Sequence, residues 1–264
     1  MRNPAYSQPV ATFERVMAPG EDSSTLSLLR PAAPAAPRRA AAEAFPPLYR
    51  AVRSASGLIL HRLFDLRVEG VERLPASGSF ILAANHHNYL DGVVLGVAVP
   101  RPIAFLVMPR VFRATPLHPS FHRRIGSIPV NLERPDPGAI KRVLRVLDAG
   151  RVVGIFPEGP FSQEGQLVRG QPGAAMIALR AGVPVVPAAI EGTYEALRGR
   201  RFYLPRRRGL AVRFGEPLYF ERPRHRPIAR LEREEITRRI MTEIAALLHA
   251  TPEPALAAGR AGAS

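Results

Sequence analysis

The stretch FILAANHHNYLD, residues 80–91, decides how the rest of the chain is interpreted. Its first five residues are all apolar, which is typical of a strand that is buried on both faces of a sheet. Polar side chains follow at once: an amide, two imidazoles and, five positions after the first histidine, a carboxylate. The stretch therefore predicts a buried strand that ends in a loop of side chains able to carry out chemistry.

Short apolar runs of this kind recur along the chain and alternate with segments of helical periodicity. The alternation predicts an α/β fold with a mostly parallel central sheet flanked by helices. Ligands of such sheets bind beyond the carboxyl ends of the strands, where the loop at residues 85–91 and the turn FPEG at residues 156–159 are expected. The expected strands are residues 79–84, 102–107, 126–130, 151–156, 183–190 and 210–215, and the expected helices are residues 90–97, 112–124, 138–149, 173–181 and 228–249.

The two ends of the chain differ in composition from this middle part. Residues 1–44 and 251–264 are Pro- and Ala-rich without an apolar period, so both are expected to be disordered tails. A single domain is expected over residues 45–250. It begins with an amphipathic helix at residues 45–66 that has basic flanks and either packs on the domain or lies in a membrane interface.

The composition limits the kinds of partner. The 264 residues include 37 Lys+Arg and 22 Asp+Glu, a net charge of +15, which attracts anionic lipid, nucleic acid or acidic proteins. The absence of cysteine excludes disulfides, thiolate metal ligands and a cysteine nucleophile. Neither a spanning apolar run nor a secretory signal is recognisable, so we expect a cytoplasmic protein or one at the inner face of a membrane.

His86 and Asp91 are the first candidates for catalysis. If the strand ends at residue 84 and a helix begins near residue 89, Asp91 lies in the first helical turn and can accept a hydrogen bond from His86 Nδ1. That bond fixes the tautomer and leaves Nε2 to act as a base. The alternative is a structural loop histidine beside a helix-capping acid. His87 is expected to face elsewhere, and no third residue has the spacing of a metal site.

The turn at residues 156–159 closes another expected strand. Pro157 and Gly159 make it rigid, so it could present Glu158 to a substrate hydroxyl or to a partner arginine, or it could simply end the strand. Arginines also surround the expected strand at residues 126–130, where they could clamp a phosphate or face solvent. These arginines are Arg123, Arg124 and Arg134.

Together these segments resemble four ordered sequence blocks of the glycerolipid acyltransferase superfamily, which includes the lysophosphatidic acid acyltransferases. The similarity extends over roughly residues 48–220. The matching blocks are Asn85-His86 with Asp91 (Asn-His-x-x-x-x-Asp), residues 126–130 (Gly-x-x-Pro-Val), residues 156–159 (Phe-Pro-Glu-Gly, with Ser162 three residues on) and residues 183–187 (Val-Pro-Val-Val-Pro).

The resemblance implies a glycerol-3-phosphate acyltransferase-like fold and an activity. A fatty acyl group would pass from acyl-CoA or acyl carrier protein to a lysophospholipid or glycerol-phosphate hydroxyl in phospholipid biosynthesis, without a cofactor or a metal. His86 would be the general base and Asp91 its partner. The residues expected to bind substrate are Asn85, Gly126, Pro129, Arg134, Phe156, Pro157, Glu158, Gly159 and Ser162.

Two departures from the family pattern concern the phosphate of the acceptor. Pro160-Phe161 stands where Thr-Arg often follows Phe-Pro-Glu-Gly, and Leu132 stands where the family often has an arginine. Another arginine (Arg123, Arg124, Arg134 or Arg169) could compensate. The acceptor could also be another lysophospholipid, or a different alcohol or amine.

The basic surface fits the cytoplasmic face of an anionic membrane, to which residues 45–66 and the arginine clusters at residues 197–209 and 221–227 would bind. Nucleic acid is not an expected partner, because no nucleic-acid-binding motif occurs. Two other functions stay open: a basic nucleic-acid-binding protein, and a hydrolase of the same thioesters or lipids. The serine-hydrolase version has no support, because the chain has no Gly-x-Ser-x-Gly motif.

Overall fold

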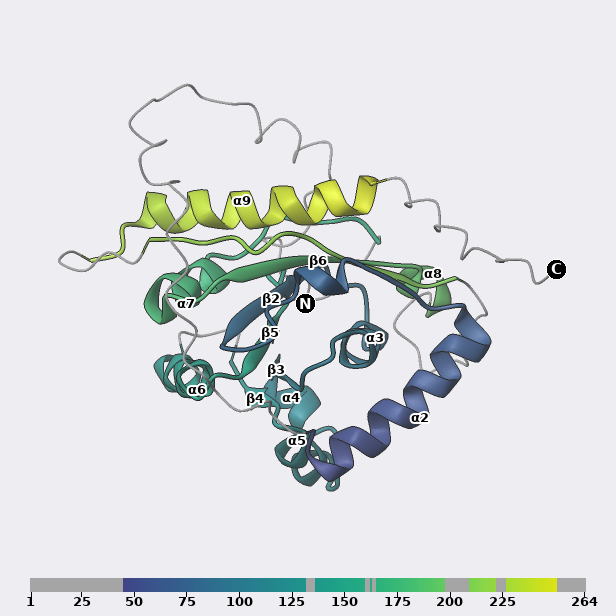
Figure 1. The fold of residues 1–264 in the computed structure, drawn as a ribbon. Helices are drawn as coiled ribbons and strands as arrows, with labels where there is room; N and C mark the ends of the chain where they lie inside the picture. Colours follow the sequence, from purple (N-terminus) through teal and green to yellow (C-terminus); the bar gives the residue numbers. More distant parts are fainter. Residues whose placement is uncertain are drawn as a thin grey trace, which may run out of the picture.

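A seven-stranded sheet forms the centre of the fold in the computed structural model, which describes residues 45–131, 136–159, 162, 165–197, 209–221 and 227–250 (Figure 1). The strand order is β1-β7-β6-β2-β5-β3-β4. The strands are β1 (Arg67–Glu69), β2 (Phe80–Ala84), β3 (Ile103–Val107), β4 (Ile128–Pro129), β5 (Val152–Ile155), β6 (Val185–Glu191) and β7 (Ala211–Phe214).

The sheet is mostly parallel, as predicted. Of the neighbouring pairs, β6 and β7 alone are antiparallel within the described ranges. The central strand β2 pairs with β5 on one side and with β6 on the other, so its carboxyl end lies in the middle of one edge of the sheet. β1 was not expected, because a strand of three residues is too short to show an alternating pattern.

Helices cover both faces of the sheet, which explains the continuous apolar strands. Ile81 and Ala83 of β2 belong to the core under α6, α7 and α9, whereas Phe80 and Leu82 belong to the core under α2 and α3 (Figure 1). The helices are α2 (Pro47–Phe64), α3 (Leu90–Ala98), α4 (Pro109–Phe112), α5 (His118–Ile125), α6 (Pro137–Asp148), α7 (Gly173–Ala181), α8 (Thr193–Ala196) and α9 (Arg230–His249), with a short 3₁₀ turn, η3 (Val71–Arg73).

The helix expected at residues 112–124 was wrong in extent, since two helices, α4 and α5, occupy this region. Pro116 lies between them, and proline disfavours the helical conformation of the residue before it. The strand expected at residues 126–130 is only two residues long, because Gly126 has a φ of 82° and ends α5 in the left-handed conformation. The last helix begins at Arg230, two residues later than expected.

The amphipathic helix predicted near residues 45–66 is α2, and it packs on the domain. Its inner face buries Tyr49, Leu60 and Phe64, and Arg53 Nη2 donates to the carbonyl oxygen of Val97 at 2.9 Å. Across the described residues, no helix combines the length and apolarity needed to cross a bilayer. The expected tails at residues 1–44 and 251–264, and most of both arginine clusters, lie outside the described residues.

Candidate active site

The loop between β2 and α3 brings His86 and Asp91 together. His86 follows the carboxyl end of β2, and Asp91 lies in the first turn of α3, as the sequence predicts. His86 Nδ1 lies 2.8 Å from Asp91 Oδ2. With the carboxylate as acceptor, Nδ1 carries the proton and Nε2 carries the lone pair.

The carboxylate of Asp91 is itself held by the backbone. Oδ2 also accepts hydrogen bonds from the amides of His87, at 2.6 Å, and Asn88, at 2.8 Å. The side chain is fully buried at the amino end of α3, where the helix dipole favours a negative charge. Because three donors fix one oxygen, Asp91 can hold the imidazole in a single orientation.

Glu158 holds the backbone of the same histidine. Its Oε1 accepts a hydrogen bond from the amide of His86 at 2.8 Å, and its Oε2 accepts one from the amide of Val168 at 3.0 Å. The carbonyl oxygen of His86 accepts a bond from the amide of Ser162 at 2.9 Å. The turn at residues 156–159 and the chain that follows it thus hold the backbone of the loop that carries His86 from both sides.

This enclosure changes the role expected for Glu158. The side chain is buried, and burial raises its pKa to about 8, although the hydrogen bonds from Val168 and His86 favour the charged form. The nearby charge of Asp91 raises the pKa further. The carboxyl group faces two backbone amides instead of a partner arginine, so we assign it the positioning of His86. Its contact with a substrate hydroxyl stays a prediction.

Aromatic stacking fixes the plane of the His86 ring. The ring lies on Phe156, with centroids 3.7 Å apart and planes 5° apart. Phe156 is in turn nearly parallel to Phe105 of β3, at a centroid distance of 6.0 Å. Only 13% of the His86 side chain is exposed, so the stack confines the imidazole while one part of it still reaches the surface.

The other polar residues of the loop tie it to the neighbouring strand and helix. The Asn85 amide exchanges two hydrogen bonds with the backbone of Ile190 in β6, at 2.9 and 2.7 Å, so this side chain joins two strands and does not face an open site. Asn88 donates to the carbonyl oxygen of Thr193 at 2.7 Å. His87 faces away from His86, as predicted, toward α8, and burial lowers its pKa.

The remaining residues of the FPEG turn shape the backbone. Gly159 has a φ of 82°, which glycine adopts without strain, and its amide donates to the carbonyl oxygen of Phe156 at 3.0 Å. The carbonyl oxygen of Pro157 accepts a bond from the amide of Gln171 at 2.7 Å. Ser162 is buried, and its hydroxyl has no hydrogen-bond partner within the described part of the chain.

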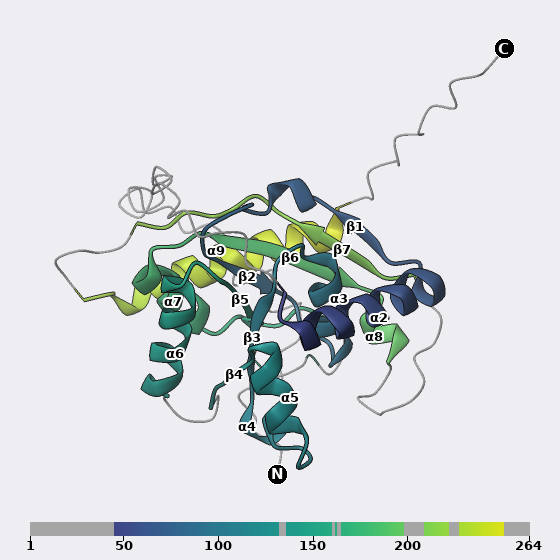
Figure 2. The same ribbon diagram turned by 60° about the horizontal axis from the view of Figure 1, so that its bottom comes forward.

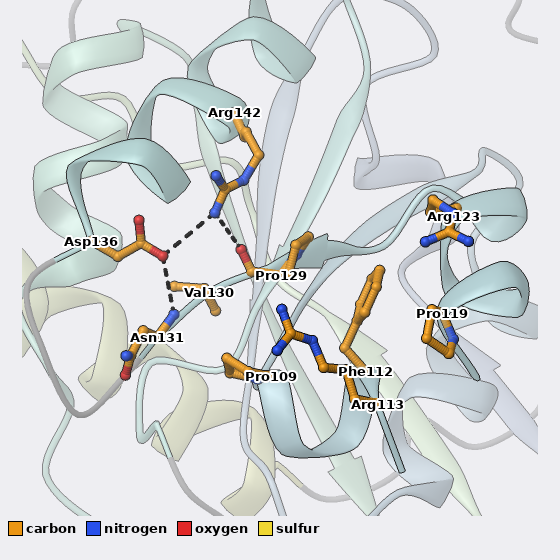
Figure 3. A pocket seen from close by; sticks show the side chains of 10 residues that line it. All are labelled: Pro109, Phe112, Arg113, Pro119, Arg123, Pro129, Val130, Asn131, Asp136 and Arg142. Atoms are coloured by element: carbon orange, nitrogen blue, oxygen red, sulfur yellow. Dashed lines mark hydrogen bonds and ion pairs between the residues drawn. The ribbon is translucent and has the colours of Figure 1, made fainter. Parts of the chain in front are cut away.

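A cavity of about 430 Å³ lies at the same edge of the sheet, next to the short strand β4 (Figure 3). Pro129, which ends β4, lines it, whereas Gly126 ends α5 and does not. The other residues that line the cavity come mainly from α4, α5 and α6 and from the segments next to them. They are Pro109, Phe112, Arg113, Pro119, Arg123, Val130, Asn131, Asp136 and Arg142.

The cavity carries positive charge. Arg142 donates to the carbonyl oxygen of Pro129 at 2.7 Å and lies 3.4 Å from Asp136 (Figure 3). Arg113 and Arg123 have neither a hydrogen bond nor an ion pair to any residue that the structure describes. The cavity can therefore accept an anion such as a phosphate.

The arginines that the sequence offered as alternative phosphate ligands occupy different places in the structure. Arg123 lines the cavity, Arg124 does not, and Arg134 lies outside the described residues. Arg169 is exposed, and its charge acts on Glu234 of α9. Sequence reasoning missed Arg113 and Arg142, because neither belongs to a recognisable motif.

Comparison with known proteins agrees with the site. The Acyltransferase family model matches residues 65–191, which include His86, Asp91 and the FPEG turn. The chain is 32% identical over 173 residues to a 1-acyl-sn-glycerol-3-phosphate acyltransferase of Bacillus subtilis, covering 65% of this chain and 83% of that protein. It is 29% identical over 143 residues to the chloroplastic LPAT1 of Arabidopsis thaliana, a 1-acyl-sn-glycerol-3-phosphate acyltransferase, covering 52% of this chain and 39% of that one.

The fold has a solved counterpart. The crystal structure of PlsC from Thermotoga maritima, a 1-acyl-sn-glycerophosphate acyltransferase, superposes with a TM-score of 0.61 at 22% identity. The similarity covers 78% of this chain and 81% of that one, and at this identity it shows the shared fold alone. The match to the Acyltransferase family model and the 32% identity over most of the Bacillus subtilis protein show that the chain is an O-acyltransferase of the glycerolipid acyltransferase superfamily.

Proposed function

We propose that the chain acylates the free hydroxyl of 1-acyl-sn-glycerol-3-phosphate or a related lysophospholipid in phospholipid biosynthesis, with His86 as general base. The names of the Bacillus subtilis and Arabidopsis thaliana relatives support this class of acceptor. The observation that carries the catalytic assignment is the 2.8 Å contact between His86 Nδ1 and Asp91 Oδ2. It makes the second ring nitrogen a base whose protonated form is stabilised by the carboxylate.

The proposed reaction needs one base and no covalent acyl-enzyme. Nε2 of His86 takes the hydroxyl proton as the acceptor oxygen attacks the thioester carbonyl carbon. The tetrahedral intermediate then collapses and the carbon–sulfur bond breaks. The imidazolium returns the proton to the leaving sulfur, so the products are an ester and a free thiol. Asp91 stabilises the imidazolium between the two proton transfers.

We propose acyl-CoA or an acyl carrier protein as the donor, without a cofactor or metal. Both donors are acidic, and the chain carries a net charge of +15. The cavity lined by Arg113 and Arg123 supplies positive charge at the catalytic edge of the sheet. It is our candidate for binding a substrate phosphate in place of the family arginines that this chain lacks at positions 132 and 161.

Two other functions can be distinguished from acyl transfer, one by its product and the other by the features that it leaves unexplained. A hydrolase would use the same histidine to activate water, and it would release a free fatty acid instead of an acylated lipid. Nucleic-acid binding would explain the positive charge, but it gives no role to the His86–Asp91 contact or to the membership of an acyltransferase family.

The test is His86→Ala, with His249→Ala as the matched control, because His249 is exposed at the end of α9. Purified proteins receive one acyl thioester and a panel of lysophospholipids, and mass spectrometry identifies the products. We expect His86→Ala to lose at least a thousandfold in kcat with an unchanged fold, and His249→Ala to behave as the wild type. Acyl transfer retained by folded His86→Ala would refute the assignment, and free fatty acid as the main wild-type product would indicate a hydrolase.

A further inference from the structure

Most of the exposed large apolar side chains lie on α2 or on the two helices that contact it, α3 and α5. Of eight well-exposed large apolar side chains in the described residues, seven lie on α2, on α5 with its N-cap, or at the start of α3 with its N-cap. Leu231 on α9 is the exception. The seven are Leu58, Ile59, Leu63, Tyr89, Val93, Leu117 and Phe121.

The most exposed of these belongs to the segment formed by α4 and α5, residues 109–125. Leu117, at the amino end of α5, is 79% exposed, and Phe121 one turn later is 37% exposed. Residues four apart lie on the same side of a helix, so the two side chains make one apolar ridge. Leaving such a ridge in water is unfavourable, which indicates a partner that covers it.

The charge around the ridge is of one sign. No Asp or Glu occurs between Asp91 and Glu133 in the sequence. The segment carries four arginines, and none of them pairs with a carboxylate anywhere in the described ranges. They are Arg110, Arg113, Arg123 and Arg124.

Two exposed arginines of α9, by contrast, each have an acidic partner. On α9, Arg230 lies 2.8 Å from Glu234, and Arg238 forms an ion pair with Glu235. A segment with an apolar ridge, several unpaired arginines and no acid is complementary to an anionic lipid surface, where the ridge enters the acyl region and the arginines meet phosphates.

The segment also lies where a membrane-bound substrate would approach. β3 ends at Val107 and α4 begins at Pro109, so the segment leaves the sheet at the same edge as His86. In Figure 2, α4 and α5 project from the sheet beyond the end of β3. In both ribbon views the amino end of α2 lies beside α5 (Figures 1 and 2). Docking through α5 would therefore bring the catalytic edge toward the lipid.

We propose that residues 109–125 form a membrane-docking element in which Leu117 and Phe121 insert into the surface of a bilayer containing anionic phospholipid. The element acts in addition to the outward face of α2. It deepens the proposed function, because it explains how a soluble thioester and a lipid acceptor meet at His86. The docking proposal can nevertheless be tested apart from the proposed reaction, because vesicle binding is measured without catalytic turnover.

The first experiment compares vesicle binding of the whole chain and its variants by flotation. The vesicles are phosphatidylcholine with or without phosphatidylglycerol. Leu117→Ser/Phe121→Ser should lower the partition coefficient on the anionic vesicles at least tenfold. Leu231→Ser removes an equally exposed leucine, 78% exposed, from α9, and it should bind as the wild type does. Leu117→Ser alone, which leaves Phe121 beside the ring of His122, guards against a local folding defect.

The second experiment tests the charge. Arg110→Gln/Arg124→Gln should abolish the preference for phosphatidylglycerol and weaken the salt dependence, whereas Arg230→Gln/Arg238→Gln, with the same change of net charge, should not. The proposal is overturned if the Leu117→Ser/Phe121→Ser protein binds vesicles like the wild type. It is also overturned if the substitutions turn a dimer into a monomer, as seen by sedimentation, without changing vesicle binding.

Activity separates this proposal from the proposed function. On a short-chain acceptor that is dissolved as monomers, Leu117→Ser/Phe121→Ser should keep its kcat, whereas on acceptor embedded in vesicles the rate should fall with binding. If the wild type transfers no acyl group but the double variant still loses vesicle binding, the proposed reaction fails and the docking element stands.

Discussion

Replacing Asp91 by asparagine should remove the charge behind His86 while leaving the loop in place. Oδ2 of Asp91 accepts hydrogen bonds from His86 Nδ1 and from the amides of His87 and Asn88. Oδ1 is buried and has no partner among the residues that the structure describes. Asparagine can keep its oxygen on the side of the three donors and place its NH₂ group at the position of Oδ1. Asp91→Asn therefore changes charge much more than shape.

The size of the effect follows from the geometry. When His86 takes a proton, the imidazolium and the carboxylate are charges about 4 Å apart, which interact by about 4 kcal/mol at an effective dielectric constant of ~20. Losing that attraction raises the barrier by the same amount, which lowers kcat about a thousandfold. The unpaired NH₂ group should also lower the free energy of unfolding by about 1–3 kcal/mol.

The assay follows release of the free thiol from an acyl thioester by purified protein, together with a denaturant titration. The control is Asp148→Asn, which removes an exposed carboxylate at the end of α6 and should leave kcat unchanged. Folded Asp91→Asn protein with a kcat within tenfold of the wild type would refute the reasoning, because His86 would then act without the charge of Asp91.

Two further substitutions test the interactions that hold the backbone and the ring of His86 in place. Burial raises the pKa of Glu158 from 4.5 to about 8, so the folded chain holds a proton that the unfolded chain has released between these pH values. The free energy of unfolding should therefore fall as the pH rises from 4.5 to 8, by at most about 5 kcal/mol. In denaturant titrations, Glu158→Gln should flatten this dependence on pH. An unchanged dependence would contradict the argument that burial raises the pKa of Glu158. A Cβ on Gly154 would lie 2.5 Å from the Phe105 ring, so Gly154→Ala should cost about 1–3 kcal/mol and lower kcat by displacing the stack under His86. Gly173→Ala, where a Cβ meets nothing within 4 Å, is the control, and equal melting temperatures for the two variants would argue against the clash.

Local sequence was a good guide wherever the partners were close along the chain. The contact of His86 with Asp91 depends on a loop of a few residues between a strand and a helix, and such a loop has few conformations. The same holds for Gly159, whose positive φ is required by the turn in which it lies. The apolar runs likewise predicted strands buried on both sides, since few other structures can bury so continuous a run.

The expectations from sequence were wrong where a single proline or glycine within a segment outweighed the apolar pattern of that segment. Pro116 divides the region around α4 and α5 into two helices, and the helix-ending Gly126 shortens β4 to two residues. In both places a single backbone preference overrides the apolar period. β1 was missed because its short sequence gives no pattern, although in the fold it pairs with β7.

The sequence by itself determined the α/β class, the family blocks and the meeting of His86 with Asp91, because each depends on residues that are near one another along the chain. Tertiary structure alone decided that Glu158 binds the backbone of His86, that Asn85 binds Ile190, and that Arg113, Arg123 and Arg142 share a cavity. These partners are brought together by the order of the strands. Strand order is set by the packing of the whole sheet, and a linear pattern of apolar runs does not encode it.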